Sequence, residues 1–185
     1  FAFSSENWHR PEAEVRALMA LLSRYLRREI KQLAEDGVRV RFIGRRDRLS
    51  PRIAKLLAWS EQATEHNTDT TLVLALDYGG RWDVGEAASS LAHDVEAGRL
   101  RAEDIDETSL SARMSLADQP TLDLCIRTGG EYRLSNFLLW QSAYAELWFT
   151  KTLWPDFTVD ELDVAIDHFA GRERRYGGRP AEAHS

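Results

Sequence analysis

The sequence predicts an α/β fold, in which one domain contains a mostly parallel central sheet with helices on both faces. Short apolar runs alternate along the 185 residues with longer segments whose apolar positions recur at helical spacing. Parallel strands need long crossover connections, and the intervening helical segments supply them. We therefore expect residues 1–185 to form a single domain with its own core.

The first helix has the clearest pattern. Apolar residues from Val15 to Leu33 recur every three or four positions, Pro11 suits the first turn and Gly37 the end, which predicts a helix over 12–35. Further helices are expected at 51–65, from about 83, and at 102–117, 136–144 and 159–175. Strands are expected at 1–3, 38–42, 71–76 (fully buried), 122–126 and 146–150.

The composition excludes several classes of protein. Hydrophobic residues make up 43% and charged residues 29%, which is typical of a globular chain. The net charge of -6 argues against a general nucleic-acid binder. The single Cys125 falls in a predicted strand, which favours a packed thiol in the reducing cytoplasm. No window approaches the roughly 18 apolar residues of a membrane span.

The segment from Arg127 to Phe137 is the strongest functional signal. Arg127 follows a predicted strand, two glycines allow a tight loop, and Ser135 precedes an expected helix. Ligands of open α/β sheets bind at the carboxyl ends of strands, and guanidinium groups bind phosphate oxygens. The pattern indicates a phosphate or diphosphate site, with a surface ion-pair loop as the alternative.

Three other segments allow two interpretations each. Residues 4–10 follow the first strand and would form a second wall of the pocket or an N-cap box for the long helix. Glu146 opens the last strand among apolar residues, so it needs an arginine or a hard cation such as magnesium as its partner. The basic tail at 172–178 is either a solvated helix end or a segment that reaches an anion site.

Residues 3–11 (FSSENWHRP), 77–83 (DYGGRWD) and 127–157 closely resemble the cis-prenyltransferase family, most of all its bacterial undecaprenyl diphosphate synthase type. Residues 172–178 (RERRYGG) resemble the family's C-terminal block, so the likeness runs through the whole chain in order. The resemblance implies an enzyme that adds isopentenyl diphosphate to an allylic diphosphate such as farnesyl diphosphate, forming Z double bonds and a long polyprenyl diphosphate for the cell-wall lipid carrier.

The resemblance also implies functions for particular residues. Asn7 would help remove the proton of the condensing unit, and Glu146 would help bind Mg²⁺. The expected substrate-binding residues are Ser4, Ser5, Glu6, Trp8, Arg10, Arg127, Arg133, Leu134, Ser135, Arg175, Gly177 and Gly178. The last three would reach a diphosphate across a homodimer interface. A tunnel between the long helix and the sheet would shelter the product, with Leu18, Leu22 and Leu26 as walls, and the lipid product implies contact with a membrane surface.

The chain departs from the family pattern in two ways. The family's first block, Met-Asp-Gly-Asn-Gly-Arg-Trp, is not present, so we expect the sequence to be incomplete at its N-terminus and by itself inactive. Tyr132 stands where many relatives carry histidine, which argues against a metal ligand at that position. The alternative function is a non-catalytic, diphosphate-binding or scaffolding subunit of a heteromeric cis-prenyltransferase.

Overall fold

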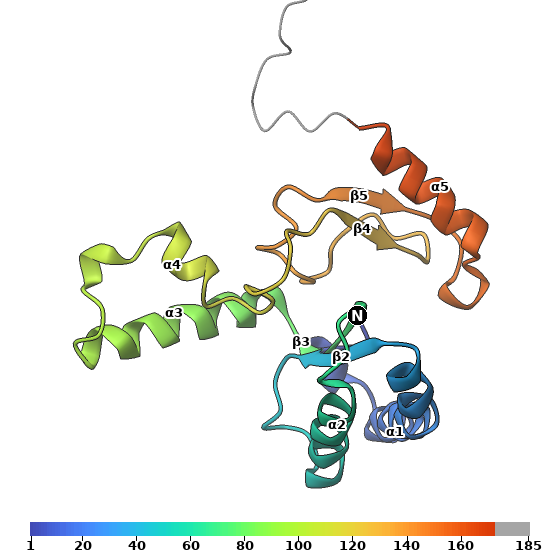
Figure 1. The fold of residues 1–185 in the computed structure, drawn as a ribbon, viewed down its shortest axis with the longest axis horizontal. Helices are drawn as coiled ribbons and strands as arrows, with labels where there is room; N and C mark the ends of the chain where they lie inside the picture. The colour runs from blue at the N-terminus through green and yellow to red at the C-terminus, as the bar shows by residue number, and fades with distance from the viewer. Residues whose placement is uncertain (173–185) are drawn as a thin grey trace, which may run out of the picture. The chain divides into compact units, whose positions relative to one another are not determined.

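The computed structural model describes residues 1–172, which divide into two compact units, residues 1–119 and the part of the chain from Pro120 onward (Figure 1). Each unit contains its own parallel sheet. The prediction that the chain forms one domain stays a prediction.

The sheet of the first unit has the strand order β1-β3-β2, and both strand pairs are parallel. These strands are β1 (Phe3–Ser4), β2 (Val38–Ile43) and β3 (Thr70–Tyr78). The expectation of a fully buried third strand was wrong for its first half: only its last four residues are buried. The strand also runs two residues further than expected.

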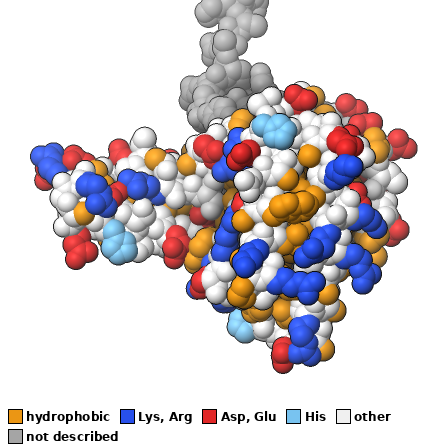
Figure 2. Space-filling view, turned by 60° about the horizontal axis from the view of Figure 1, so that its bottom comes forward, with side chains coloured by type: hydrophobic (Ala, Val, Ile, Leu, Met, Phe, Trp, Pro, Cys, Tyr) orange, Lys and Arg blue, Asp and Glu red, His pale blue; other side chains and the backbone are white. Residues whose placement is uncertain are grey.

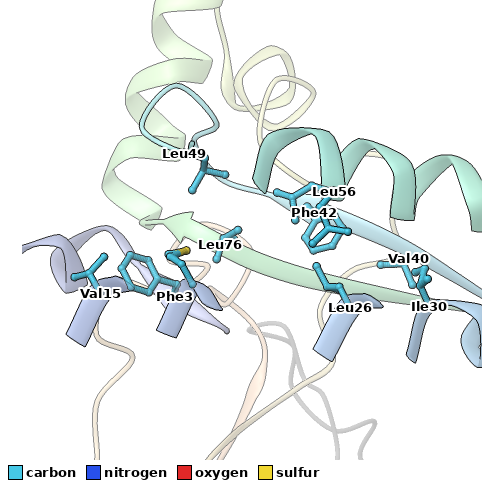
Figure 3. Close-up of a cluster of buried hydrophobic side chains, with 11 residues drawn as sticks. Phe3, Val15, Leu26, Ile30, Val40, Phe42, Leu49, Leu56 and Leu76 are labelled. Carbon is cyan, nitrogen blue, oxygen red and sulfur yellow. The ribbon is translucent and has the colours of Figure 1, made fainter. Parts of the chain in front are cut away.

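Two helices cover one face of this sheet: α1 (Glu12–Glu35) and α2 (Pro51–Thr64). The bounds of α1 are those predicted, and its N-cap is Pro11, without a side-chain cap. The Ser50 hydroxyl accepts a hydrogen bond from the Ile53 amide and caps α2. Val40 and Phe42 of β2 point to the same side because strand residues alternate, and both pack in the core with residues of α1 and α2, including Leu26, Ile30, Leu56 and Leu57 (Figure 3).

Side chains of α2 also accept hydrogen bonds from backbone amides of β2. The Val40 amide donates to the hydroxyl of Thr64 at 2.9 Å, and the Phe42 amide donates to the carboxylate of Glu61 at 3.0 Å. Asn67 donates to the Ala34 and Val38 carbonyl oxygens at 3.0 Å each, which joins the end of α1 to the start of β2. These contacts remove the unpaired polar groups that an edge strand would otherwise present.

The remainder of the first unit is less regular than expected. Helix α3 (Gly80–Glu96) begins three residues before the predicted start. The helix expected over 102–117 is broken into a 3₁₀ turn, η2 (Ala102–Asp104), and a short α4 (Glu107–Ser111). The break has a local cause, because the Asp106 carboxylate accepts the Ser109 amide at 2.7 Å and starts a new helix.

The second unit pairs β4 (Leu124–Arg127) with β5 (Glu146–Phe149) in parallel. A 3₁₀ turn, η3 (Trp154–Asp156), leads to α5 (Val159–Ala170), which lies next to β5 in Figure 1. The Trp148 and His168 rings, 4.9 Å apart, join α5 to that strand. The helix ends at a Gly171 C-cap, so the predicted extension to Arg175 was wrong for Gly171 and Arg172, and Arg175 itself lies outside the described residues.

No helix forms over 136–144, where the sequence predicted one. Ser135, Asn136 and Leu138 have φ angles of 49°, 63° and 43°, in the left-handed region. A right-handed helix needs φ near -63°, so consecutive turns replace it. No helix amino terminus therefore directly follows Ser135 in this unit.

Candidate functional site

The second unit places Arg127 at the carboxyl end of β4, as predicted. Its guanidinium donates to the Ser135 hydroxyl at 2.7 Å and to the backbone carbonyl of Arg133. Both acceptors are neutral, and among residues 1–172 no carboxylate forms an ion pair with Arg127. A half-buried guanidinium with neutral partners keeps its charge available to an anion.

The glycine loop after β4 is held against the chain that follows β5. The amides of Gly129 and Gly130 donate to the carbonyls of Thr152 and Thr150, at 2.8 and 2.9 Å. Both glycines have positive φ, 90° and 77°, which other residues adopt only with strain. The loop thereby reverses the direction of the chain and brings the Ser135 hydroxyl into contact with the Arg127 guanidinium.

Arg133 forms an ion pair with Glu131 at 2.5 Å, and both side chains are exposed. An exposed pair of this kind contributes at most about 1 kcal/mol, so it is easily exchanged for another anion. Leu134 is half-buried, and its carbonyl accepts the Phe137 amide at 3.1 Å. The Tyr132 ring rests 5.6 Å from the Phe149 ring.

Glu146 lies at the other end of the strand pair. Its register partner is Leu124, whereas Arg127 pairs with Phe149. Three residues of strand separate the two ends by about 10 Å, so Glu146 does not belong to the Arg127 cluster within this unit. Its half-buried carboxylate faces Arg172 at 3.9 Å, too long for a hydrogen bond.

The chemistry of Glu146 fits one ligand of Mg²⁺, which commonly takes one or two carboxylates and completes its shell with water and substrate phosphates. Within residues 1–172, no group of three or more His, Cys, Asp or Glu side chains is arranged to hold a metal. A dedicated protein cage for the ion is therefore not formed by this part of the chain.

In the first unit, residues 5–9 form a 3₁₀ turn, η1 (Ser5–His9), directly after β1. The Asn7 side-chain oxygen accepts the Ser4 amide at 2.9 Å, which fixes the carboxamide. The segment therefore caps the short turn η1. It does not cap α1 as expected, because the N-cap of α1 is Pro11. Glu6 and Arg10 are exposed, and Arg10 pairs with Glu14 at 2.6 Å.

Two polar atoms of this turn are buried without a hydrogen-bond partner, the Ser5 hydroxyl and the Trp8 indole nitrogen. Buried polar groups are nearly always paired, so such atoms call for an explanation. A ligand with hydrogen-bonding groups would satisfy them. The turn therefore offers polar atoms that could bind a ligand, in addition to its capping contacts.

Sequence reasoning missed Arg48 and Asp77, which support this wall. Asp77 is fully buried, and Arg48 contacts it through two hydrogen bonds, one of them from Nε at 2.9 Å. The same guanidinium lies 5.5 Å from the centre of the Trp8 ring. Arg48 follows the end of β2, so applying the strand-end argument to every strand would have found it.

The structure forms a cavity at a different place from the expected product tunnel, and the tunnel itself stays a prediction. A cavity of about 570 Å³ lies between α1 and residues 48–53, with apolar lining from Val15, Met19, Leu49 and Ile53. Leu26 is instead fully buried in the core, and Leu18 and Leu22 pack against that core. A helical wheel separates buried from exposed faces, but it does not show which apolar residues border a cavity.

Arg175, Gly177 and Gly178 lie outside the residues that the structure describes. Within residues 1–172, none of the helices has the length and apolar character needed to cross a membrane.

Comparison with known proteins agrees with the geometry. Residues 1–177 match the family described as "Putative undecaprenyl diphosphate synthase". The chain is 55% identical to a Xanthomonas axonopodis ditrans,polycis-undecaprenyl-diphosphate synthase ((2E,6E)-farnesyl-diphosphate specific), over 96% of this chain and 69% of the relative. A Pseudomonas aeruginosa protein of the same name is 50% identical, over 96% and 70%.

Two solved structures share the fold. Lavandulyl diphosphate synthase from Lavandula x intermedia, in complex with dimethylallyl diphosphate, matches with a TM-score of 0.90 and 35% identity, covering 95% of this chain and 76% of that one. A probable undecaprenyl diphosphate synthase from Campylobacter jejuni matches at 0.84 and 36%, covering 96% and 81%. The predicted α/β fold class is confirmed. The chain belongs to the undecaprenyl diphosphate synthase family of cis-prenyltransferases.

Proposed function

We propose that this protein is a cis-prenyltransferase that condenses isopentenyl diphosphate units onto farnesyl diphosphate and makes a long Z-polyprenyl diphosphate. The observation that best supports it is Arg127, a half-buried cation at the carboxyl end of β4 that contacts only neutral acceptors. The names of the relatives supply the allylic substrate and the undecaprenyl product.

In each cycle the allylic C–O bond breaks and its diphosphate leaves with the electron pair. A new C–C bond forms between the allylic C1 and C4 of isopentenyl diphosphate. The proton lost from C2 of the condensing unit passes to the departing diphosphate, which leaves the Z double bond. Arg127 and Ser135 hold the diphosphate of isopentenyl diphosphate, and Arg133 joins them when it exchanges Glu131 for the substrate. Arg127 is already held by its neutral acceptors, so it binds this diphosphate without rearranging.

Asn7 orients the departing proton through its side-chain oxygen, which has a second lone pair beside the one used by Ser4. Ser5 and Trp8 supply the buried polar atoms of the same wall. Glu146 supplies one carboxylate ligand to Mg²⁺, an ion that neutralises diphosphate charge when bound. We further propose a homodimer, in which Arg175, Gly177 and Gly178 reach the partner's diphosphate, and a cytoplasmic location with contact between the product and a membrane.

Two measurements on the purified, full-length gene product test this proposal. Calorimetry with isopentenyl diphosphate and Mg²⁺ should show saturable binding, and incubation of labelled isopentenyl diphosphate with farnesyl diphosphate should give a butanol-extractable Z-polyprenyl product. Binding without turnover would assign the non-catalytic diphosphate-binding function instead. Absence of binding would overturn both.

A further inference from the structure

The cavity between α1 and residues 48–53 has an unusual composition at its rim. Of the thirteen residues that line it, five are arginine, namely Arg16, Arg24, Arg27, Arg48 and Arg52, and none is acidic. The whole chain has a net charge of -6. The rim of this cavity is therefore positively charged although the whole chain is negatively charged, so chance alone does not explain the cluster of arginines.

Three of these arginines form no ion pair within the described residues. Arg48 pairs with Asp77 and Arg16 with Glu12. Arg24, Arg27 and Arg52 form no ion pair with any residue in the described part of the chain. Their positive charge is thus available to a partner outside the molecule.

The exposed side of α1 is also rich in basic residues. From Arg16 to Lys31 it has five basic residues and one acid, Glu29, which pairs with Arg28. Leu21 and Tyr25, large apolar side chains on this stretch, are 61% and 51% exposed. In Figure 2, which turns the bottom of Figure 1 forward, hydrophobic side chains lie near the centre of the face, and Lys and Arg side chains lie beside and below them.

We propose that this face, the basic rim with Leu21 and Tyr25, docks on the head groups of an anionic phospholipid bilayer. A basic helix face with exposed apolar residues is the pattern of proteins that lie on a membrane surface. A polyanion such as RNA would match the arginines but not the apolar cavity and the exposed Leu21. Docking here would place the opening of an apolar cavity against lipid.

Vesicle co-sedimentation without any substrate tests this surface separately from the prenyltransferase activity. The protein should bind vesicles of phosphatidylcholine with phosphatidylglycerol, release them at high salt, and bind pure phosphatidylcholine weakly. Each basic residue near an anionic surface changes affinity about fivefold, so the double variant Arg24→Gln/Arg27→Gln should lose about thirtyfold.

A matched control is Arg39→Gln/Arg101→Gln, which removes the same charge. Both arginines are exposed, and Arg39 lies on the face of β2 opposite Val40 and Phe42. This control should keep most of the vesicle binding. Equal binding to neutral vesicles, or an equal loss in the control, would overturn the proposal. If Arg24→Gln/Arg27→Gln changed the oligomeric state and left vesicle binding intact, the face would belong to a second copy of the chain instead.

Discussion

Each unit has an arginine near the carboxyl end of a parallel strand: Arg127 is the last residue of β4, and Arg48 lies five residues beyond the end of β2. Arg48 follows β2 and contacts a fully buried carboxylate, Asp77. Arg127 ends β4 and contacts only a hydroxyl and a carbonyl oxygen. The partner differs in charge: Asp77 neutralises Arg48, whereas the neutral acceptors of Arg127 leave its charge available to the substrate we propose. Position alone does not decide between these two outcomes.

The largest effect is expected from Arg48→Ala. The change leaves the Asp77 carboxylate buried without its cation, and breaking a buried pair costs about 3 kcal/mol or more. Urea unfolding followed by circular dichroism measures this loss. Arg48→Lys keeps the charge and should recover part of the stability. If Arg48→Ala unfolds at the same urea concentration as the unchanged protein, the structural interpretation of Arg48 fails.

Arg127→Ala should have the opposite effects: a large loss of ligand binding and a small loss of stability. If Arg127 holds diphosphate oxygens as proposed, by two charge-assisted hydrogen bonds each worth about 1.5 kcal/mol or more, its loss should weaken isopentenyl diphosphate binding about a hundredfold. The free energy of unfolding should change by less than about 1 kcal/mol, because the acceptors of Arg127 are neutral. Calorimetry and urea unfolding on one sample separate the two effects.

Arg133→Ala should weaken isopentenyl diphosphate binding severely as well, by about tenfold or more. The expected loss is smaller than for Arg127→Ala because Arg133 must first leave Glu131. A matched control is Arg101→Ala, which removes an equally exposed arginine from an ion pair with Glu103. If Arg133→Ala and this control bind isopentenyl diphosphate equally well, Arg133 has no part in the site.

The smallest effect concerns Cys125, next to Arg127 along β4. Burial raises the pKa of this thiol above its ordinary value. Since the thiolate is the reactive form, iodoacetamide near neutral pH should modify the folded protein about tenfold more slowly than the urea-unfolded chain. Equal rates would show that β4 leaves the thiol open to solvent.

Much of the fold and part of the site were predictable from local patterns. The bounds of α1 followed from the spacing of its apolar residues, and both β4 and β5 followed from short apolar runs. Arg127 and Ser135 were predicted to act together, and they share a hydrogen bond. The absence of a helix over 136–144 could not be predicted, because the apolar residues there do recur at helical spacing. The left-handed φ angles at Ser135, Asn136 and Leu138 come from the surrounding loop.

By itself, the sequence determined the order of the strands, the bounds of α1 and the family resemblance, because each depends on residues close together along the chain. Anion binding by the segment after β4 stays a prediction. Tertiary structure alone decided that Arg48 and Asp77, 29 positions apart, form a pair, and that Glu146 lies at the opposite strand end from Arg127. It also decided that arginines of α1 and α2 border one cavity. Partners across space depend on strand register and helix packing, which no local pattern specifies.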